Sequence, residues 1–190
     1  MKRISSLLFI VCILLLISCK ETTKNETTTT VQPTQVNGKG QSAVVDKDSS
    51  PNALQVAMSM DDFKTLVVAV KAAGVEDALV NAGPLTVFAP VNSAFDKLPE
   101  GTVASLLKPE NKSKLAYILK NHVAPANYKV KTLEKNVRKG RKLYMASGKY
   151  LDVTKKGDDL YVGGVKILKS VKVSNGWVHV IGDILVPSEN

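Results

Sequence analysis

Residues 85–99 read LTVFAPVNSAFDKLP, a stretch in which an apolar run is followed by a proline and by residues typical of a turn and a short helix. Its first five residues form a short apolar run, β-branched in part, that ends at Pro90 and predicts a buried strand. Asn92 is expected to cap the short helix that follows, from which Phe95 and Leu98 point back at the core. The stretch is therefore a corner between a strand and a helix, and folding alone accounts for its residue types.

An amphipathic helix is predicted before this corner. Its apolar positions recur at i, i+3, i+4 and i+7: Phe63, Leu66, Val67, Val70 and Ala73. Asp61 supplies negative charge at the start of the helix, and Gly74 is expected to end it.

After the corner, helices give way to strands. Thr102 is expected to begin a short helix, and the next helix has an apolar face formed by Leu115, Ile118, Leu119 and His122. From about residue 128 the chain changes to short β-prone runs separated by glycines: 142–145, 150–154, 160–162, 165–167, 171–173 and 177–181. Because helices cluster first and strands later, the sequence predicts an α+β domain rather than alternating units around a parallel sheet.

The last β-prone run follows Asn175-Gly176, which are predicted to form a turn. Alternation places Trp177, His179 and Ile181 on one face of this run and two valines on the other. This pattern, like that of the corner, is mainly architectural.

Three blocks of the sequence resemble the signature blocks of the fasciclin-like domain family. Residues 85–99 are similar to the first block, residues 119–123 (LKNHV) to the histidine block, and residues 175–187 to the second block. The blocks occur in the family's order across residues 51–187. The resemblance implies a single fasciclin-like domain over residues 51–190, an α+β fold with a seven-stranded β-wedge and helices packed at one end.

The resemblance also assigns roles to particular residues. The structural residues of the motif blocks are Pro90, Asn92, Phe95, Asp96, Gly176 and His179. In the family the block histidine usually follows a tyrosine, and the pair is linked to ligand or receptor binding, whereas here Asn121 precedes His122. Both are candidate binding residues on that basis, although the residues themselves favour a structural His122, whose pKa burial would lower and a carboxylate such as Asp96 would raise. Animal members carry an Asp-Ile pair associated with integrin recognition where this chain has Ser170-Val171, so integrin binding is not implied.

The N-terminal residues predict export and lipid anchoring. Two basic residues precede an apolar run of signal-peptide length at residues 7–17. The run ends in a sequence that resembles a bacterial lipoprotein cleavage box, with Cys19 as the acylated, palmitate-bearing residue; an ordinary signal peptide is the alternative. We expect residues 1–18 to be a lipoprotein signal peptide and residues 19–50 to be the lipidated cysteine and a flexible Thr/Ser-rich stalk, attached to the outer membrane or cell surface of a Gram-negative bacterium.

Positive charge is concentrated in one segment. The chain has a net charge of +9. Its content of 44% hydrophobic residues excludes a wholly disordered chain. Residues 108–142 contain eleven Lys and Arg against two Glu. The charge is densest in the basic quartet, defined as Arg138, Lys139, Arg141 and Lys142. Such a patch favours an anionic polymer, namely acidic polysaccharide or lipid headgroups, while a solvated face is the structural alternative. Nucleic acid is the least favoured polymer, because only Tyr128 and Tyr144 lie nearby in the sequence.

No motif in the sequence points to catalysis. The only cysteines are Cys12 and Cys19, and the two histidines, His122 and His179, lie in separate blocks. Without a nucleophile–base pair, a metal set or paired carboxylates, we expect no enzyme, no cofactor and no metal site. The sequence predicts a membrane-anchored adhesion or interaction module for an extracellular protein or glycan, with electrostatic binding of an anionic polymer through residues 108–142 as the alternative. It leaves the ligand and the oligomeric state open.

Overall fold

The computed structural model of the chain describes residues 50–80 and 83–187. The predicted signal peptide, Cys19 and the predicted stalk up to residue 49 lie outside the described residues. Within the described part, no helix combines the length and the apolar character needed to cross a bilayer.

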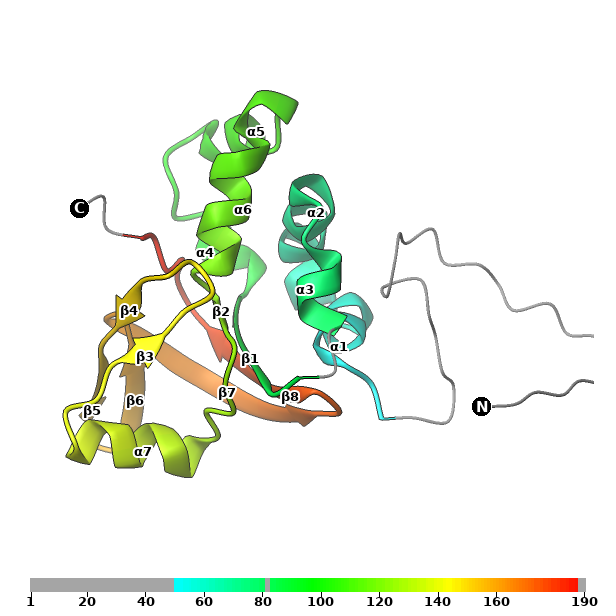
Figure 1. Cartoon of the computed structure of the whole chain (residues 1–190). Helices are drawn as coiled ribbons and strands as arrows, with labels where there is room; N and C mark the ends of the chain where they lie inside the picture. The colour runs from blue at the N-terminus through cyan, green and yellow to red at the C-terminus, as the bar shows by residue number, and fades with distance from the viewer. Residues whose placement is uncertain (1–49, 81–82, 188–190) are drawn as a thin grey trace, which may run out of the picture. The chain divides into compact units, whose positions relative to one another are not determined.

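Helices make up most of the N-terminal half of the described chain (Figure 1). The helices of the described chain are α1 (Ala53–Ser59), η2 (Asp61–Phe63), α2 (Lys64–Ala73), α3 (Glu76–Val80), α4 (Asn92–Phe95), α5 (Thr102–Leu106), η3 (Pro109–Asn111), α6 (Lys112–Lys120) and, in the second half, α7 (Val130–Arg138). The predicted end of α2 is confirmed, because Gly74 adopts a left-handed φ of 66° and its N–H closes the last turn. The helices expected from Thr102 and around Leu115 are confirmed as α5 and α6.

The strands are β1 (Leu85–Pro90), β2 (Val123–Ala124), β3 (Leu143–Tyr144), β4 (Tyr150–Leu151), β5 (Val153–Lys156), β6 (Asp159–Val162), β7 (Val165–Val173) and β8 (Gly176–Ile181). Six of them form one sheet in the order β2-β1-β8-β7-β6-β5, and β3 and β4 form a separate two-stranded sheet. The α+β class is confirmed, with eight strands among the described residues in place of the seven expected. The runs expected at 165–167 and 171–173 are one strand, β7, with an irregularity in its register.

The parallel pairing of β1 with β8 joins the first and the last strand of the described chain. It runs over six residue pairs, from Leu85 opposite Gly176 to Pro90 opposite Ile181. Gly176 is the first residue of β8 rather than part of the turn, which lies at residues 174–175. A Cβ on Gly176 would overlap the carbonyl oxygen of Leu85 and lie 2.7 Å from its carbonyl carbon. Only glycine allows β1 and β8 to approach this closely.

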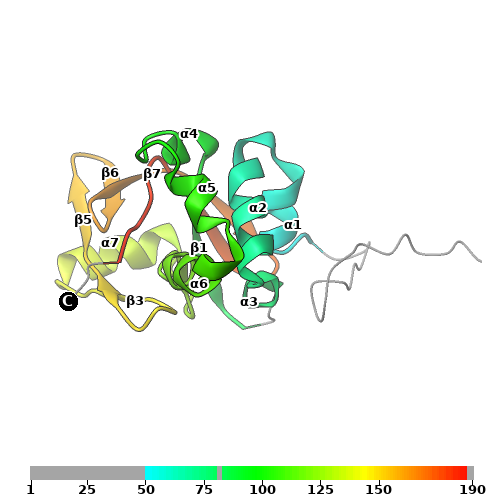
Figure 2. The same ribbon diagram turned by 90° about the horizontal axis from the view of Figure 1, so that it is seen from above.

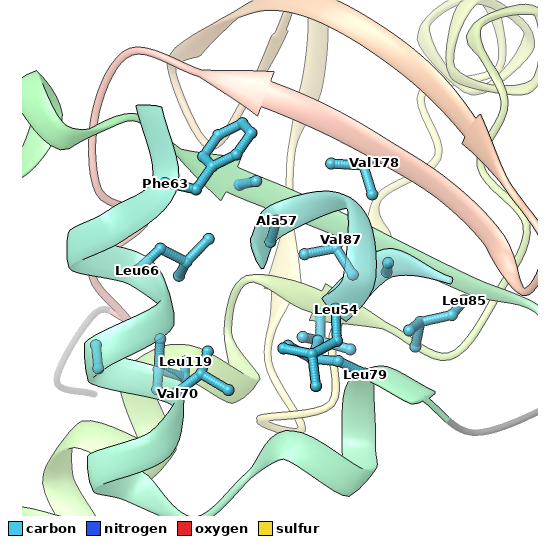
Figure 3. Close-up of a cluster of buried hydrophobic side chains, with 14 of the residues drawn as sticks. Leu54, Ala57, Phe63, Leu66, Val70, Leu79, Leu85, Val87, Leu119 and Val178 are labelled. Atoms are coloured by element: carbon cyan, nitrogen blue, oxygen red, sulfur yellow. The ribbon is translucent and has the colours of Figure 1, made fainter. Parts of the chain in front are cut away.

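β1 is buried along its whole length because its two faces pack into different cores. One face contributes Leu85 and Val87 to a core shared with α1, α2, α3 and α6 (Figure 3). The other face contributes Phe88 to a second core that Leu133 of α7 and Ile181 of β8 help to fill. Seen from above, α7 lies on one side of β1, and α1 and α2 lie on the other (Figure 2). The predicted alternation of β8 is confirmed, since its valines join the first core and Ile181 joins the second.

Helix α7 contradicts the prediction that the chain after residue 128 is strand and turn. It lies apart from the other helices, beside the smaller strands (Figure 1). Leu133 is fully buried and Val137, four residues later, packs partly against the second core. Val130, Leu133 and Val137 recur at i, i+3 and i+7, so the sequence carries an amphipathic helix signal here that the sequence-based prediction passed over.

Asn92 caps a different helix from the one expected. The N-cap of α4 is Val91, and no side chain caps that helix. Instead, the Asn92 side-chain oxygen accepts a hydrogen bond from the Thr65 N–H at 3.0 Å, in the first turn of α2. The Asn92 amide also donates to the Asp61 carbonyl oxygen at 2.8 Å. The corner after Pro90 is thereby attached to the start of α2.

Candidate functional site

Asn121 and His122, the candidate binding residues of the histidine block, are buried at the C-terminal end of α6, with exposures of 0% and 3%. The Asn121 amide donates to the Leu185 carbonyl oxygen at 2.9 Å, and its side-chain oxygen accepts from the Ser147 hydroxyl at 2.8 Å. Nε2 of His122 accepts the Leu185 N–H at 2.9 Å. The two side chains therefore hold both backbone polar groups of Leu185, and we call Asn121, His122 and Leu185 the C-terminal clamp. A direct role in ligand binding stays a prediction for both residues.

The hydrogen bonds of His122 define its tautomer. Because the Leu185 N–H only donates, Nε2 must accept, and the proton lies on Nδ1, which donates to the Ile118 carbonyl oxygen at 2.9 Å. Burial lowers the pKa of His122 to about 4, opposed by the bond to Ile118. Asp96, which was expected to raise this pKa, is exposed and is not among the groups that shift it. His122 is therefore neutral near neutral pH.

His179 is the second buried histidine, with an exposure of 0%. Its Nε2–H donates to the Tyr128 carbonyl oxygen at 2.7 Å, and its Nδ1 accepts from the Ser170 hydroxyl at 2.7 Å. The ring stacks on Phe88 with centroids 5.4 Å apart. Burial lowers the pKa of His179, opposed by the bond to Tyr128. Each ring nitrogen thus has a structural partner.

Ser170 and His179 have the spacing of a nucleophile and its base. However, the two residues face each other across the β7–β8 ladder, and the imidazole is buried. The structure has an apolar cavity beside α5 and α6, with two shallower hollows next to it. Neither Ser170 nor His179 lines this cavity or these hollows. The pair holds one strand to the next. Over residues 50–80 and 83–187, no three His, Cys, Asp or Glu side chains come close enough to hold a metal ion.

The basic quartet lies at the C-terminal end of α7 and in the turn that leads to β3. All four side chains are exposed. Lys142 forms an ion pair with Asp152 at 3.1 Å, whereas Arg138, Lys139 and Arg141 have no ion pair within the described part of the chain. Cations at this position interact favourably with the helix dipole, so the helix itself accounts for some of the cluster. The three unpaired cations remain available to an external anion.

The structure divides the basic residues of segment 108–142 into two groups. The first group consists of Lys112, Lys114 and Lys120 on α6 and of Lys108 just before this helix. The other seven basic residues lie on α7 and on both sides of it. Figure 1 shows α6 in the upper part of the domain and α7 at the bottom. The basic residues of the segment therefore lie on two separate helices, and the quartet belongs to the group around α7.

An exposed aromatic pair follows the quartet. Tyr144 of β3 and Tyr150 of β4 are opposite each other in the two-stranded sheet, with ring centroids 5.3 Å apart. Their exposures are 45% and 63%. Tyr150 was not predicted from the sequence to lie beside Tyr144, because only the register of the hairpin brings the two rings together. The turn at Gly148 between two β-prone runs was the available signal.

The chain is similar in sequence to known proteins. A sequence model of the fasciclin domain matches residues 61–187. Protein sll1483 of Synechocystis sp. is 41% identical over 162 residues, which cover 83% of this chain and 87% of that protein. The Sus scrofa transforming growth factor-beta-induced protein ig-h3 is 34% identical over 139 residues, which cover 72% of this chain and 19% of that protein.

The chain is also similar to a solved structure, described as "Novel Fold Revealed by the Structure of a FAS1 Domain Pair from the Insect Cell Adhesion Molecule Fasciclin I". The TM-score is 0.66 at 19% sequence identity, and the match covers 72% of this chain and 51% of that chain. At this identity the likeness shows a shared fold.

Proposed function

Since this chain belongs to the fasciclin domain family, we propose that it is an anchored adhesion module whose domain binds an extracellular protein or glycan. Fasciclin domains are found in cell-adhesion and matrix-interacting proteins, and family members are generally non-enzymatic. The observation that carries the proposal is the family match over residues 61–187.

The interior of the domain supports binding at the surface rather than chemistry inside. Among the described residues, no buried side-chain nitrogen or oxygen lacks a hydrogen-bond partner. His122 and His179, the titratable groups with the strongest burial, are both used in holding the backbone and a neighbouring strand. A general acid or base needs a ring nitrogen that is free for the substrate, and each ring nitrogen of these two histidines already has a partner within the domain.

The proposal includes a lipid anchor outside the cell. Fasciclin domains occur in secreted or surface proteins. The sequence around Cys19 supports acylation, and a stalk of about 31 residues, at roughly 5–6 Å times the square root of length, reaches on the order of 30 Å. Substitution Cys19→Ala is expected to abolish incorporation of labelled palmitate into the chain, and metabolic labelling measures this. A Cys19→Ala variant that is labelled as strongly as the wild type would argue against lipidation at Cys19.

A second candidate is electrostatic binding of an acidic polysaccharide by the basic quartet. The favouring observation is that three of the four cations are exposed and unpaired within the described residues, close in sequence to the exposed Tyr144 and Tyr150. Cations attract carboxylate or sulfate groups, and the flat apolar faces of the two rings suit the C–H faces of sugar rings.

Charge reversal of the quartet is expected to weaken binding to acidic polysaccharide by at least about tenfold, because four favourable interactions become repulsive. The substitutions are Arg138→Glu, Lys139→Glu, Arg141→Glu and Lys142→Glu. Since all four side chains are exposed, the loss of stability should be limited to the interaction with the α7 dipole and the exposed Lys142–Asp152 ion pair, on the order of 1–2 kcal/mol, and the variant should stay folded. Binding is measured on an array of glycans and matrix proteins, at about 50 mM and about 500 mM salt, because exposed charges are screened beyond a Debye length and this length shortens as the salt concentration rises.

A matched variant carries the same total change of charge at dispersed, exposed positions: Lys71→Glu, Lys108→Glu, Lys169→Glu and Lys172→Glu. If it weakens binding as much as the quartet variant does, net charge rather than the quartet is responsible. Binding that is insensitive to both salt and the quartet would remove the electrostatic candidate and leave the adhesion proposal with another face of the domain. An array with no ligand at all would count against both.

A further inference from the structure

An apolar cavity of about 200 Å³ lies where α5, α6, the corner after β1 and the C-terminal segment meet. Its lining includes Phe95, Leu106, Ile118 and Val186. A dry, apolar engineered cavity of about 150 Å³ binds benzene, so a cavity of this size has room for an apolar group of about six carbons. The cavity is separate from the basic quartet and from the tyrosine pair.

The cavity adjoins a polar hollow, with which it shares Thr102, Leu106 and Lys114. Lys114 is exposed and has no ion pair within the part of the chain that the structure describes. The hollow also includes Glu100. A ligand head here meets one free cation and, on the hollow's wall, one carboxylate. The hollow therefore favours a ligand head with one negative charge over a head with two negative charges.

We propose that this cavity binds a monocarboxylate of about six carbons. The tail occupies the cavity, and the carboxylate pairs with the Lys114 ammonium. A neutral alcohol of the same length gains the apolar contact without the ion pair, and a dicarboxylate meets Glu100.

The C-terminal clamp positions one wall of this site. Ile184 and Val186, which line the cavity, flank Leu185, and Leu185 is held at both its N–H and its carbonyl oxygen by His122 and Asn121. His122 also lines the cavity. The histidine block thus acts on the ligand through the backbone that it fixes, as a set of positioning residues.

The test is calorimetric titration of the full-length chain with hexanoate and with 1-hexanol. Hexanoate is expected to bind saturably at one site, with 1-hexanol at least about tenfold weaker. Lys114→Gln should weaken hexanoate to the level of the alcohol, while Lys108→Gln, an exposed lysine outside the cavity lining, should change neither. Val103 lines the cavity, so Val103→Trp should fill it and abolish the binding of both hexanoate and 1-hexanol. Helix α5 should tolerate the larger side chain, because none of its residues is buried.

Several outcomes would overturn the proposal. They are no saturable hexanoate binding, equal affinities for hexanoate and 1-hexanol, or a loss of hexanoate binding in Lys108→Gln as large as in Lys114→Gln. Hexanoate binding that survives in a folded Val103→Trp variant would also overturn it. If circular dichroism shows Val103→Trp to be unfolded, the comparison of the two lysine variants decides, because both side chains are exposed.

Discussion

The Gly176→Ala variant is expected to lose about 4 kcal/mol or more of unfolding free energy, which is a large fraction of the roughly 5–15 kcal/mol of a typical domain. The added Cβ would overlap the Leu85 carbonyl oxygen, and this is backbone that no side-chain rotation can move. Gly176 also has a φ of 148°, which L side chains rarely adopt. Separating Leu85 from Gly176 opens the first pair of the parallel β1–β8 ladder.

The matched control for this variant is Gly164→Ala. Gly164 also has a positive φ, 82°, but its added Cβ would meet nothing within 4 Å. The Gly164→Ala variant should therefore lose about 1–2 kcal/mol of unfolding free energy, which is the contribution of backbone strain alone. Urea denaturation followed by circular dichroism measures both variants. Equal losses in the two variants would contradict the claim that the contact between β1 and β8 requires a glycine.

Acidification from pH 6.5 to pH 4 is expected to cost about 3 kcal/mol of unfolding free energy through His122 alone. Burial lowers the pKa of folded His122 to about 4 from the ordinary 6.5, so in this window the unfolded chain binds the proton and the folded chain does not. Stability is therefore fully present above pH 6.5 and falls as the pH drops toward 4, by about 1.4 kcal/mol per pH unit. His179, whose pKa burial also lowers, adds a loss of the same sign.

The variant His122→Gln tests this assignment, because its Oε1 is able to accept the Leu185 N–H but does not titrate. It should be less stable than the wild type at pH 7 and should lose much less stability on acidification. Far-UV circular dichroism is the appropriate probe of unfolding. The ring centroids of Trp177 and His179 are 6.3 Å apart, so tryptophan fluorescence would respond directly to the protonation of His179. A His122→Gln variant with the full wild-type pH dependence would show that His122 does not carry it.

Features set by neighbouring residues could be predicted from the sequence. Gly74 ends α2 and Pro90 ends β1 as expected, because both act on the backbone within a turn or two. The alternation of β8 was also sufficient to sort its side chains between two faces. In each case the cause lies within a few residues of its effect.

Features that depend on contacts between distant segments could not be predicted. The side chain of Asn92 has a capping residue's chemistry, but only the tertiary fold shows that it caps α2 rather than α4. The pairing of Tyr144 with Tyr150 requires the hairpin register. The C-terminal clamp joins residues 63 and 64 positions apart, and no local pattern announces it.

The structure also changes how the candidate binding residues are interpreted. Asn121 and His122 are used internally, in the clamp, whereas the quartet is exposed and mostly unpaired among the described residues. Of the surfaces predicted from sequence, the quartet is therefore the one that an external partner reaches directly. It occupies one end of the domain rather than the whole segment from 108 to 142.

Whether the domain mediates attachment is measured by counting the cells that adhere to a matrix-coated surface. Three groups of cells display the full chain, a chain truncated after residue 50, or the full chain with the quartet reversed. Attachment is expected to fall to background when the domain is absent, and the quartet variant shows whether that face contributes. Equal attachment by cells with and without the domain, at equal surface display, would rule out an adhesive role for the domain.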